Sequence, residues 1–189
     1  MKLDKFDQIL VVDLECTCDD PQPPGFVQEV IEVGACLLNT TTYEVTCPTS
    51  ILVVPTIGSV SDFCTRLTTI TPSMVTFENG AVSFAMACEQ LDADPLLAKQ
   101  RAWASWGDFD RTTMETQSAK EGVVYPFGLT HFNVRALSRL VFGEGRASKG
   151  AKQAAETIGV EWTGTHHRGI DDALNIAKIF AAILRKARS

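Results

Sequence analysis

Asp13 and Glu15 are the first residues of the chain whose type and spacing suggest chemistry. They end residues 8–16, a run of apolar and β-branched side chains that predicts a buried central strand. Residues two apart on a strand project from the same face, so the two carboxylates lie side by side. Burial and mutual repulsion destabilise such a pair, and a hard divalent cation such as Mg²⁺ or Mn²⁺ removes that cost. The pattern indicates a candidate metal site, and a strand that simply ends in solvent is the plainer alternative.

A second acidic segment follows the short strand that we expect over residues 101–105. Asp108 and Asp110 stand at the expected start of a helix over residues 109–121. A carboxylate at this place either caps the helix, by accepting from its exposed N–H groups, or faces a partner elsewhere in the fold. The residues alone leave both interpretations open.

Two histidines and two aspartates lead into the C-terminal helix, which we expect over residues 170–187. Asp171 and Asp172 fall in its first turn, where one is expected to cap the helix and the other to lie beside its apolar face. A histidine has an ordinary pKa of about 6.5 and can therefore take a proton from water at neutral pH. His166 and His167 are both candidates for such a general base.

The three acidic segments are best interpreted as parts of one site. Four carboxylates from three elements can hold two cations about 4 Å apart, an arrangement that stabilises the attacking and leaving oxygens of phosphoryl transfer. Residues 1–110 hold 16 of the 23 acids, whereas residues 111–189 hold 12 of the 17 lysines and arginines. The first part is therefore suited to cations and the second to phosphates, although ordinary surface variation would give a similar distribution.

The composition predicts one soluble globular domain over residues 1–189. The chain is 45% hydrophobic and 21% charged, which argues against disordered, collagen-like and coiled-coil classes. No apolar run reaches the length of about 18 residues that a membrane-spanning helix needs, and the N-terminus lacks the pattern of a signal peptide. The six cysteines lie in apolar surroundings, and we expect them to be reduced, in a cytoplasmic protein, rather than to bind zinc.

The remaining pattern predicts an α/β fold. The expected strands cover residues 8–16, 30–38, 50–54 and 101–105, and the short connections between the first three favour an antiparallel meander. One helix is expected to begin at Thr71, and the others to cover residues 83–91, 109–121, 133–142, 148–158 and 170–187. A meander followed by alternating helices and strands indicates a mixed sheet with helices on its faces.

The order and spacing of the acidic segments resemble the motifs of a known family. A first motif, Asp-x-Glu-x-Thr-Cys, is present at residues 13–18, and a last motif, in which an Asp follows a His by five residues, is satisfied by His167 and Asp172. Further matching segments are residues 29–34, 63–71, 109–110 and 133–137, with Arg135 in place of a Lys. Over residues 8–185 the chain resembles the DEDDh branch of the DnaQ-like 3′–5′ exonucleases, in the group of the histone-mRNA and enhanced-RNAi exonucleases and their bacterial relatives.

The resemblance implies an RNase H-like fold, with a central mixed five-stranded sheet flanked by helices. It also implies a metal-dependent 3′–5′ exonuclease that releases nucleoside 5′-monophosphates from single-stranded RNA or DNA, with RNA favoured. By resemblance, Asp13 bridges two Mg²⁺ ions, for which Mn²⁺ can substitute. Glu15 and Asp172 complete one metal site and Asp110 holds the other, while His167 is the general base. Every acidic position of the pattern is filled, as expected of an active enzyme.

The resemblance also places the terminal nucleotide against the first acidic strand, with aromatic and basic side chains nearby. The candidate substrate contacts are Leu14, Cys16, Thr17, Trp106, Phe109, Arg111 and Arg168, and further phosphate candidates are Arg135, Arg139, Arg146, Lys149 and Lys152. Two other functions remain. One is a non-enzymatic member that binds a partner, and the other is a cysteine hydrolase using Cys16 or Cys18 with His167. The second is disfavoured because neighbouring carboxylates raise a thiol pKa.

Overall fold

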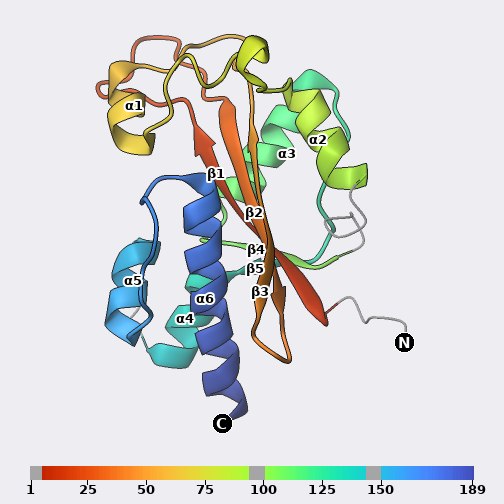
Figure 1. Cartoon of the computed structure of the whole chain (residues 1–189), viewed down its shortest axis with the longest axis vertical. Coiled ribbons are helices and arrows are strands. Elements are labelled where there is room, and N and C mark those ends of the chain that lie inside the picture. Colours follow the sequence, from red (N-terminus) through yellow and green to blue (C-terminus); the bar gives the residue numbers. More distant parts are fainter. Residues whose placement is uncertain (1–5, 94–100, 144–149) are drawn as a thin grey trace.

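The computed structural model describes residues 6–93, 101–143 and 150–189 of the chain. A five-stranded sheet in the order β3-β2-β1-β4-β5 forms its centre (Figure 1). The strands are β1 Gln8–Cys16, β2 Val30–Asn39, β3 Val45–Leu52, β4 Trp103–Ser105 and β5 His131–Asn133. β1 pairs antiparallel with β2 and parallel with β4, and β4 pairs parallel with β5, so the sheet is mixed, as predicted.

Helices cover both faces of the sheet. They are α1 Asp62–Thr68, α2 Phe84–Ala93, α3 Phe109–Glu121, α4 Val134–Phe142, α5 Ala151–Ile158 and α6 Gly169–Arg188, with a short 3₁₀ helix at Phe77–Asn79. The long α6 lies along the sheet with α4 and α5 beside it, and α2 and α3 lie on the opposite side (Figure 1). No helix within the described residues is both long enough and apolar enough to cross a membrane.

Side chains of β1 point alternately to the two faces of the sheet, and both faces are buried. Leu10, Val12 and Leu14 pack into a core with α2 and α3 residues, whereas Ile9 and Val11 pack into a second core with α6 residues. Side chains two apart share a face, so Asp13 and Glu15 project toward the α6 side. The strand thus carries the acidic pair on the face that the C-terminal helix covers.

Three local predictions were wrong. The strand expected over residues 50–54 is β3 Val45–Leu52. β3 is an edge strand, and its polar first residues lack the apolar pattern by which a strand is predicted. No helix begins at Thr71, whose carbonyl instead accepts from the amide of Met74 at 3.0 Å in a turn. The helix α1 was not predicted, and its N-cap is Ser61, whose side chain accepts from the amide of Cys64 at 3.0 Å. For the helix expected over 148–158, residues 148 and 149 lie outside the described part, and α5 covers Ala151–Ile158.

A glycine pair sets how closely α6 approaches the sheet. Gly34 on β2 lies opposite Asp13 on β1, and the first residue of α6, Gly169, packs directly against it. A Cβ added at Gly34 would stand 1.9 Å from the carbonyl carbon of Gly169, and a Cβ at Gly169 would stand 3.1 Å from the carbonyl oxygen of Asp13. The absence of two side chains therefore lets the N-terminus of α6 lie over the acidic end of β1.

Gly34→Ala is expected to lower the free energy of unfolding by about 3 kcal/mol or more, because backbone atoms of α6 must move away from the added methyl group. Chemical denaturation of the variant and the parent protein measures the difference. Gly58→Ala is the matched control, since the nearest atom to a Cβ there, Glu29 Oε2, lies at an ordinary 3.6 Å. Equal stability of Gly34→Ala and the parent protein would show that α6 does not dock as described.

Candidate active site

Three carboxylates from two distant parts of the chain meet at the end of β1. Asp13 and Glu15 come from the strand, and Asp172 comes from the first turn of α6. One carboxylate oxygen from each lies within 4.8 Å of the others. Glu15 and Asp172 are buried, and Asp13 is partly exposed to a pocket of about 340 Å³ that all three line. The predicted convergence of the first and last acidic segments is therefore present in the structure.

Asp110 approaches the same pocket from the first turn of α3. Its Oδ1 accepts a hydrogen bond from the backbone amide of Leu14 at 3.0 Å, which fixes the carboxylate against β1. Among the described residues, the carboxylates whose oxygens lie within 4.8 Å of one another are those of Asp13, Glu15 and Asp172, and Asp110 is not one of them. Asp108, the alternative, precedes the helix and pairs with Arg111 at 3.3 Å and with Asn133 at 2.8 Å. Of the two acids, only Asp110 lines the pocket among the described residues.

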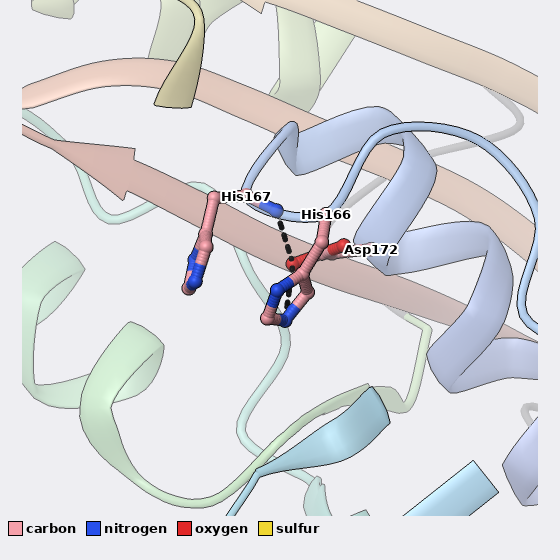
Figure 2. Close-up of side chains that lie close together, drawn as sticks. All are labelled: His166, His167 and Asp172. Carbon is pink, nitrogen blue, oxygen red and sulfur yellow. Dashed lines mark hydrogen bonds and ion pairs between the residues drawn. The ribbon is translucent and has the colours of Figure 1, made fainter. Parts of the chain in front are cut away.

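The histidine segment contacts Asp172 through the backbone of His167 and the side chain of His166. The backbone amide of His167 donates to Asp172 Oδ2 at 3.2 Å, and His166 Nε2 stands 4.0 Å from the same oxygen (Figure 2). His167 has a φ of 63°, a left-handed conformation that costs a non-glycine residue free energy and often occurs at functional sites. Both rings line the pocket, with their centroids 3.9 Å apart. Asp171 instead accepts from the amide of Thr165 at 2.8 Å.

Burial and mutual repulsion change the protonation of these groups. Burial, with the charges of Asp110 and Asp172, raises the pKa of Asp13 well above its ordinary value. Burial raises the pKa of Glu15 to about 8 and that of Asp172 to about 7. It raises the pKa of Asp110 to about 6, although hydrogen bonds from Leu14 and Ser105 oppose the shift. The metal-free site therefore holds carboxylic acids that share protons near neutral pH.

The same burial keeps the two histidines neutral. Burial and the nearby charge of Lys152 lower the pKa of His167 below its ordinary value. Burial, with the charge of His167, lowers the pKa of His166 to about 4. Both imidazoles are therefore deprotonated at pH 7 and able to accept a proton or to ligate a metal.

The donor set fits a divalent cation. Asp172 Oδ1 is buried without a hydrogen-bond partner among the described residues, and it belongs to a carboxylate that faces two more. Carboxylate oxygens are the ligands that Mg²⁺ and Mn²⁺ prefer. The raised pKa values mean that these carboxyl groups bind protons near neutral pH. A cation held by Asp13, Glu15 and Asp172 would take the place of those protons.

The metal-free protein is expected to lose stability as the pH rises from about 6.5 to 8. Above the ordinary histidine pKa of about 6.5 the imidazoles are neutral in both states, and the folded state binds more protons than the unfolded state because the pKa values of Glu15 and Asp172 are raised in the fold to about 8 and about 7. Mg²⁺ should therefore raise the melting temperature more at pH 8 than at pH 5.5. Thermal unfolding in chelator and in Mg²⁺ at both pH values measures this difference, and an equal Mg²⁺ effect at both would contradict it.

Two supporting groups were not identified as such from the sequence. Glu32, buried on β2, accepts from Ser50 Oγ at 2.6 Å, from the amide of Gly169 at 2.9 Å and from Arg168 Nε at 3.2 Å. It thereby ties the start of α6 to the sheet. Behind Asp110, the hydroxyl of Ser105 lies 3.0 Å from Nε2 of His131. Their partners lie far away in the sequence, which is why spacing did not reveal these contacts.

The candidate substrate contacts divide into two sets. Leu14, Cys16, Trp106 and Phe109 line the pocket, whereas Thr17, Arg111 and Arg168 lie outside its lining among the described residues. The hydroxyl of Thr17 accepts from the amide of Glu29 at 2.9 Å, and Arg111 and Arg168 pair with Asp108 and Glu32. Arg146 and Lys149 lie outside the described residues. Burial, followed by the charge of Asp110, raises the pKa of the Cys16 thiol, which weakens it as a nucleophile.

Comparisons with known proteins identify relatives of the chain. The human 3′-5′ exoribonuclease 1 is 30% identical over 188 residues, which is 95% of this chain and 53% of the relative. The probable 3′-5′ exonuclease KapD of Bacillus subtilis (strain 168) is 27% identical over 178 residues, 93% of this chain and 83% of the relative. The chain thus spans about half of the human relative's length and most of the bacterial one's.

A solved structure supports the same relationship. The nuclease domain of 3′hExo, a DEDDh family member bound to rAMP, superposes with a TM-score of 0.82 and 30% identity, over 95% of this chain and 92% of that domain. The expected RNase H-like arrangement of a mixed five-stranded sheet with flanking helices is confirmed. Since the match to the Exonuclease (RNase_T) family covers residues 10–180, the chain belongs to this family.

Proposed function

We propose that this chain is a divalent-metal-dependent 3′–5′ exonuclease that shortens single-stranded RNA and releases nucleoside 5′-monophosphates. The observation that carries the proposal is the meeting of Asp13, Glu15 and Asp172 with two neutral histidines in one pocket. Membership of the exonuclease family, and relatives named 3′-5′ exoribonuclease, support the direction of attack and the preference for RNA.

The carboxylates would hold the metal ions. Asp13 would contribute its carboxylate to both Mg²⁺ sites, and Glu15 and Asp172, whose carboxylates lie beside it, would complete one of them. Asp110, fixed by the Leu14 amide, is assigned to the other site. Bound Mg²⁺ or Mn²⁺ would stabilise the charge that develops on the attacking and leaving oxygens.

The remaining residues position the strand and move a proton. The His167 ring, neutral because its pKa is lowered, accepts a proton from the water that attacks the terminal phosphodiester. The water oxygen forms a new bond to phosphorus as the P–O3′ bond breaks. The leaving O3′ takes a proton from solvent, so that the shortened strand ends in a 3′-hydroxyl and the released nucleoside carries the phosphate on its 5′ carbon. Leu14, Trp106 and Phe109, which line the pocket, are suited to contact the terminal base. Glu32 accepts a hydrogen bond from the amide of Gly169 and so positions the N-terminus of α6. Asp172 lies in the first turn of this helix and His167 just before it.

Matched RNA and DNA oligonucleotides of one sequence test the proposal directly. Purified protein should release labelled mononucleotide from a 3′-labelled single strand in Mg²⁺ or Mn²⁺, faster from RNA, and should release none in chelator. A 5′-labelled copy should give a ladder that shortens from the 3′ end. Release from the 5′ end, or equal rates with and without chelator, would overturn the proposal.

A further inference from the structure

A group of polar side chains joins β5 to the turn between β4 and α3. His131 and Asn133 come from β5, and each contacts one end of this turn. Nε2 of His131 lies 3.0 Å from the hydroxyl of Ser105, the last residue of β4. Nδ2 of Asn133 donates at 2.8 Å to Oδ2 of Asp108, the residue that precedes α3. The turn held at these two points leads directly into Asp110, which is assigned to the second metal site.

His131 has a buried imidazole that the proposed mechanism does not use. Its side chain is 4% exposed, and its ring centroid lies 4.2 Å from that of Trp103. Burial and the charge of Arg111 lower the pKa of His131 to about 4, so the ring is neutral at pH 7 and has one donor and one acceptor nitrogen. An aromatic ring without nitrogen would fill the same space, and a buried polar group costs free energy unless it is hydrogen-bonded. The contact with Ser105 is therefore the feature that packing alone does not explain.

The hydroxyl of Ser105 has one proton and faces three possible acceptors among the described residues. They are Nε2 of His131 at 3.0 Å, the carbonyl oxygen of Gly107 at 3.3 Å, and the carboxylate of Asp110. An ionised carboxylate, as a metal ligand must be, only accepts hydrogen bonds, so its hydrogen bond with Ser105 requires the hydroxyl to donate. The hydroxyl can then only accept from His131, which requires the proton of the imidazole to be on Nε2.

The other ring nitrogen of His131 does not need that proton. Nδ1 stands 4.0 Å from Asp108 Oδ1, which is beyond hydrogen-bond distance. Asp108 is engaged by other groups, because Arg111 lies 3.3 Å from Oδ1 and Asn133 donates to Oδ2 at 2.8 Å. The tautomer with the proton on Nε2 therefore provides a continuous series of hydrogen bonds from the imidazole, through the hydroxyl of Ser105, to the carboxylate.

We propose that His131 is a positioning residue for the second metal site, on which it acts through Ser105. Nε2–H of His131 donates to the hydroxyl of Ser105, and the hydroxyl donates to Asp110. Together with the amide of Leu14, the hydroxyl gives this carboxylate two donors from the protein, so the carboxylate keeps one orientation in the pocket. The inference rests on the proposed function, because it concerns a carboxylate that the proposed function assigns to a metal ion.

Two substitutions of His131 measure the effect on the second metal ion. His131→Phe keeps an aromatic ring against Trp103 and removes the donor, whereas His131→Gln restores an N–H near the place of Nε2. Titration with Mn²⁺, followed by electron paramagnetic resonance, should show two bound ions in the wild-type protein. In His131→Phe the first ion should bind as in the wild type and the second about 10-fold more weakly, and His131→Gln should restore the second affinity. An unchanged second affinity in His131→Phe would overturn the inference.

Ser105→Ala tests whether His131 acts through the hydroxyl. It should weaken binding of the second Mn²⁺ ion as much as His131→Phe does, and the double variant should show no further loss, because both changes break the same series of hydrogen bonds. Additive losses would mean that His131 acts by packing, and the inference would be wrong. Phe127→Leu is the matched control, since the Phe127 ring stacks on Trp103 at 4.6 Å and does not involve Ser105. It should lower stability and leave both Mn²⁺ affinities unchanged.

Nuclear magnetic resonance separates this inference from the proposed function. Long-range ¹H–¹⁵N spectra distinguish the two tautomers of a neutral imidazole, and His131 should carry its proton on Nε2. The amide resonance of Leu14, which donates to Asp110 at 3.0 Å, should shift in His131→Phe and return in His131→Gln. Both spectra are taken at pH 8, where Asp110 is ionised, without metal or substrate, so they decide the inference even if the protein binds one ion or cleaves no strand. A proton on Nδ1, or a Leu14 amide that does not respond to His131→Phe, would overturn it.

Discussion

Asp13→Asn is expected to lower the rate of strand shortening by about 1,000-fold or more, because it removes the one carboxylate assigned to both metal ions. Its carboxylate lies beside those of Glu15 and Asp172, at the position where the proposed metal ions are held. The amide keeps the shape of the side chain and removes its charge. Single-turnover rates on a 3′-labelled RNA at saturating Mg²⁺ measure the loss.

The same substitution should stabilise the metal-free protein at pH 8. Repulsion from Asp110, Asp172, Glu15 and Glu32 contributes to the raised pKa of Asp13, so removing its charge relieves these pairs. A gain of about 1 kcal/mol in the free energy of unfolding, with loss of activity, would separate a functional carboxylate from a structural one.

Asp92→Asn, an exposed carboxylate on α2, is the matched control and should alter neither activity nor stability. If Asp13→Asn retained a tenth of the activity, or if Asp92→Asn were equally damaging, the assignment of Asp13 would be wrong.

The parts of the fold that were predicted correctly are those whose pattern is continuous and local. β1 and the buried β2 are runs of apolar side chains, and α6 carries an apolar stripe along 20 residues. The strand that corresponds to β3 was predicted too far along the chain. Only Ile51, near its end, is buried, so the polar start of the strand resembles a loop. α1 has only seven residues, too few for a periodic pattern, and the proline after Thr71 was mistaken for the start of a helix.

The residues alone suggested that the three acidic segments act together, but only the resemblance chose between neighbouring candidates such as Asp171 and Asp172, since Asp13 and Asp172 are brought together by the tertiary fold. The spacing of motifs along the sequence could not show which contacts position α6 against the sheet. The contact between Gly34 and Gly169 and the hydrogen bonds that Glu32 accepts from Arg168 and Gly169 join residues more than 100 positions apart. Each of these residues is unremarkable within its own segment. A contact between two strands and a helix end has no local period, so only coordinates reveal it.

His167→Ala is expected to lower the rate by about 100- to 10,000-fold, the usual range for loss of a general base. In the wild-type protein the rate should rise with pH through the lowered pKa of His167 and level off at a lower pH than an ordinary histidine would give, because only the neutral ring accepts a proton. In His167→Ala this rise should vanish.

The carboxylates also titrate in this range, and the Mg²⁺ concentration distinguishes them from His167. A rise in rate caused by deprotonation of Glu15 or Asp172 moves to lower pH as Mg²⁺ increases, because the ion competes with protons for the same oxygens. A rise caused by His167 keeps its position at saturating Mg²⁺. His166→Ala is the closest comparison, since His166 also lines the pocket and stands 4.0 Å from Asp172. A larger loss in His166→Ala than in His167→Ala would reassign the base to His166.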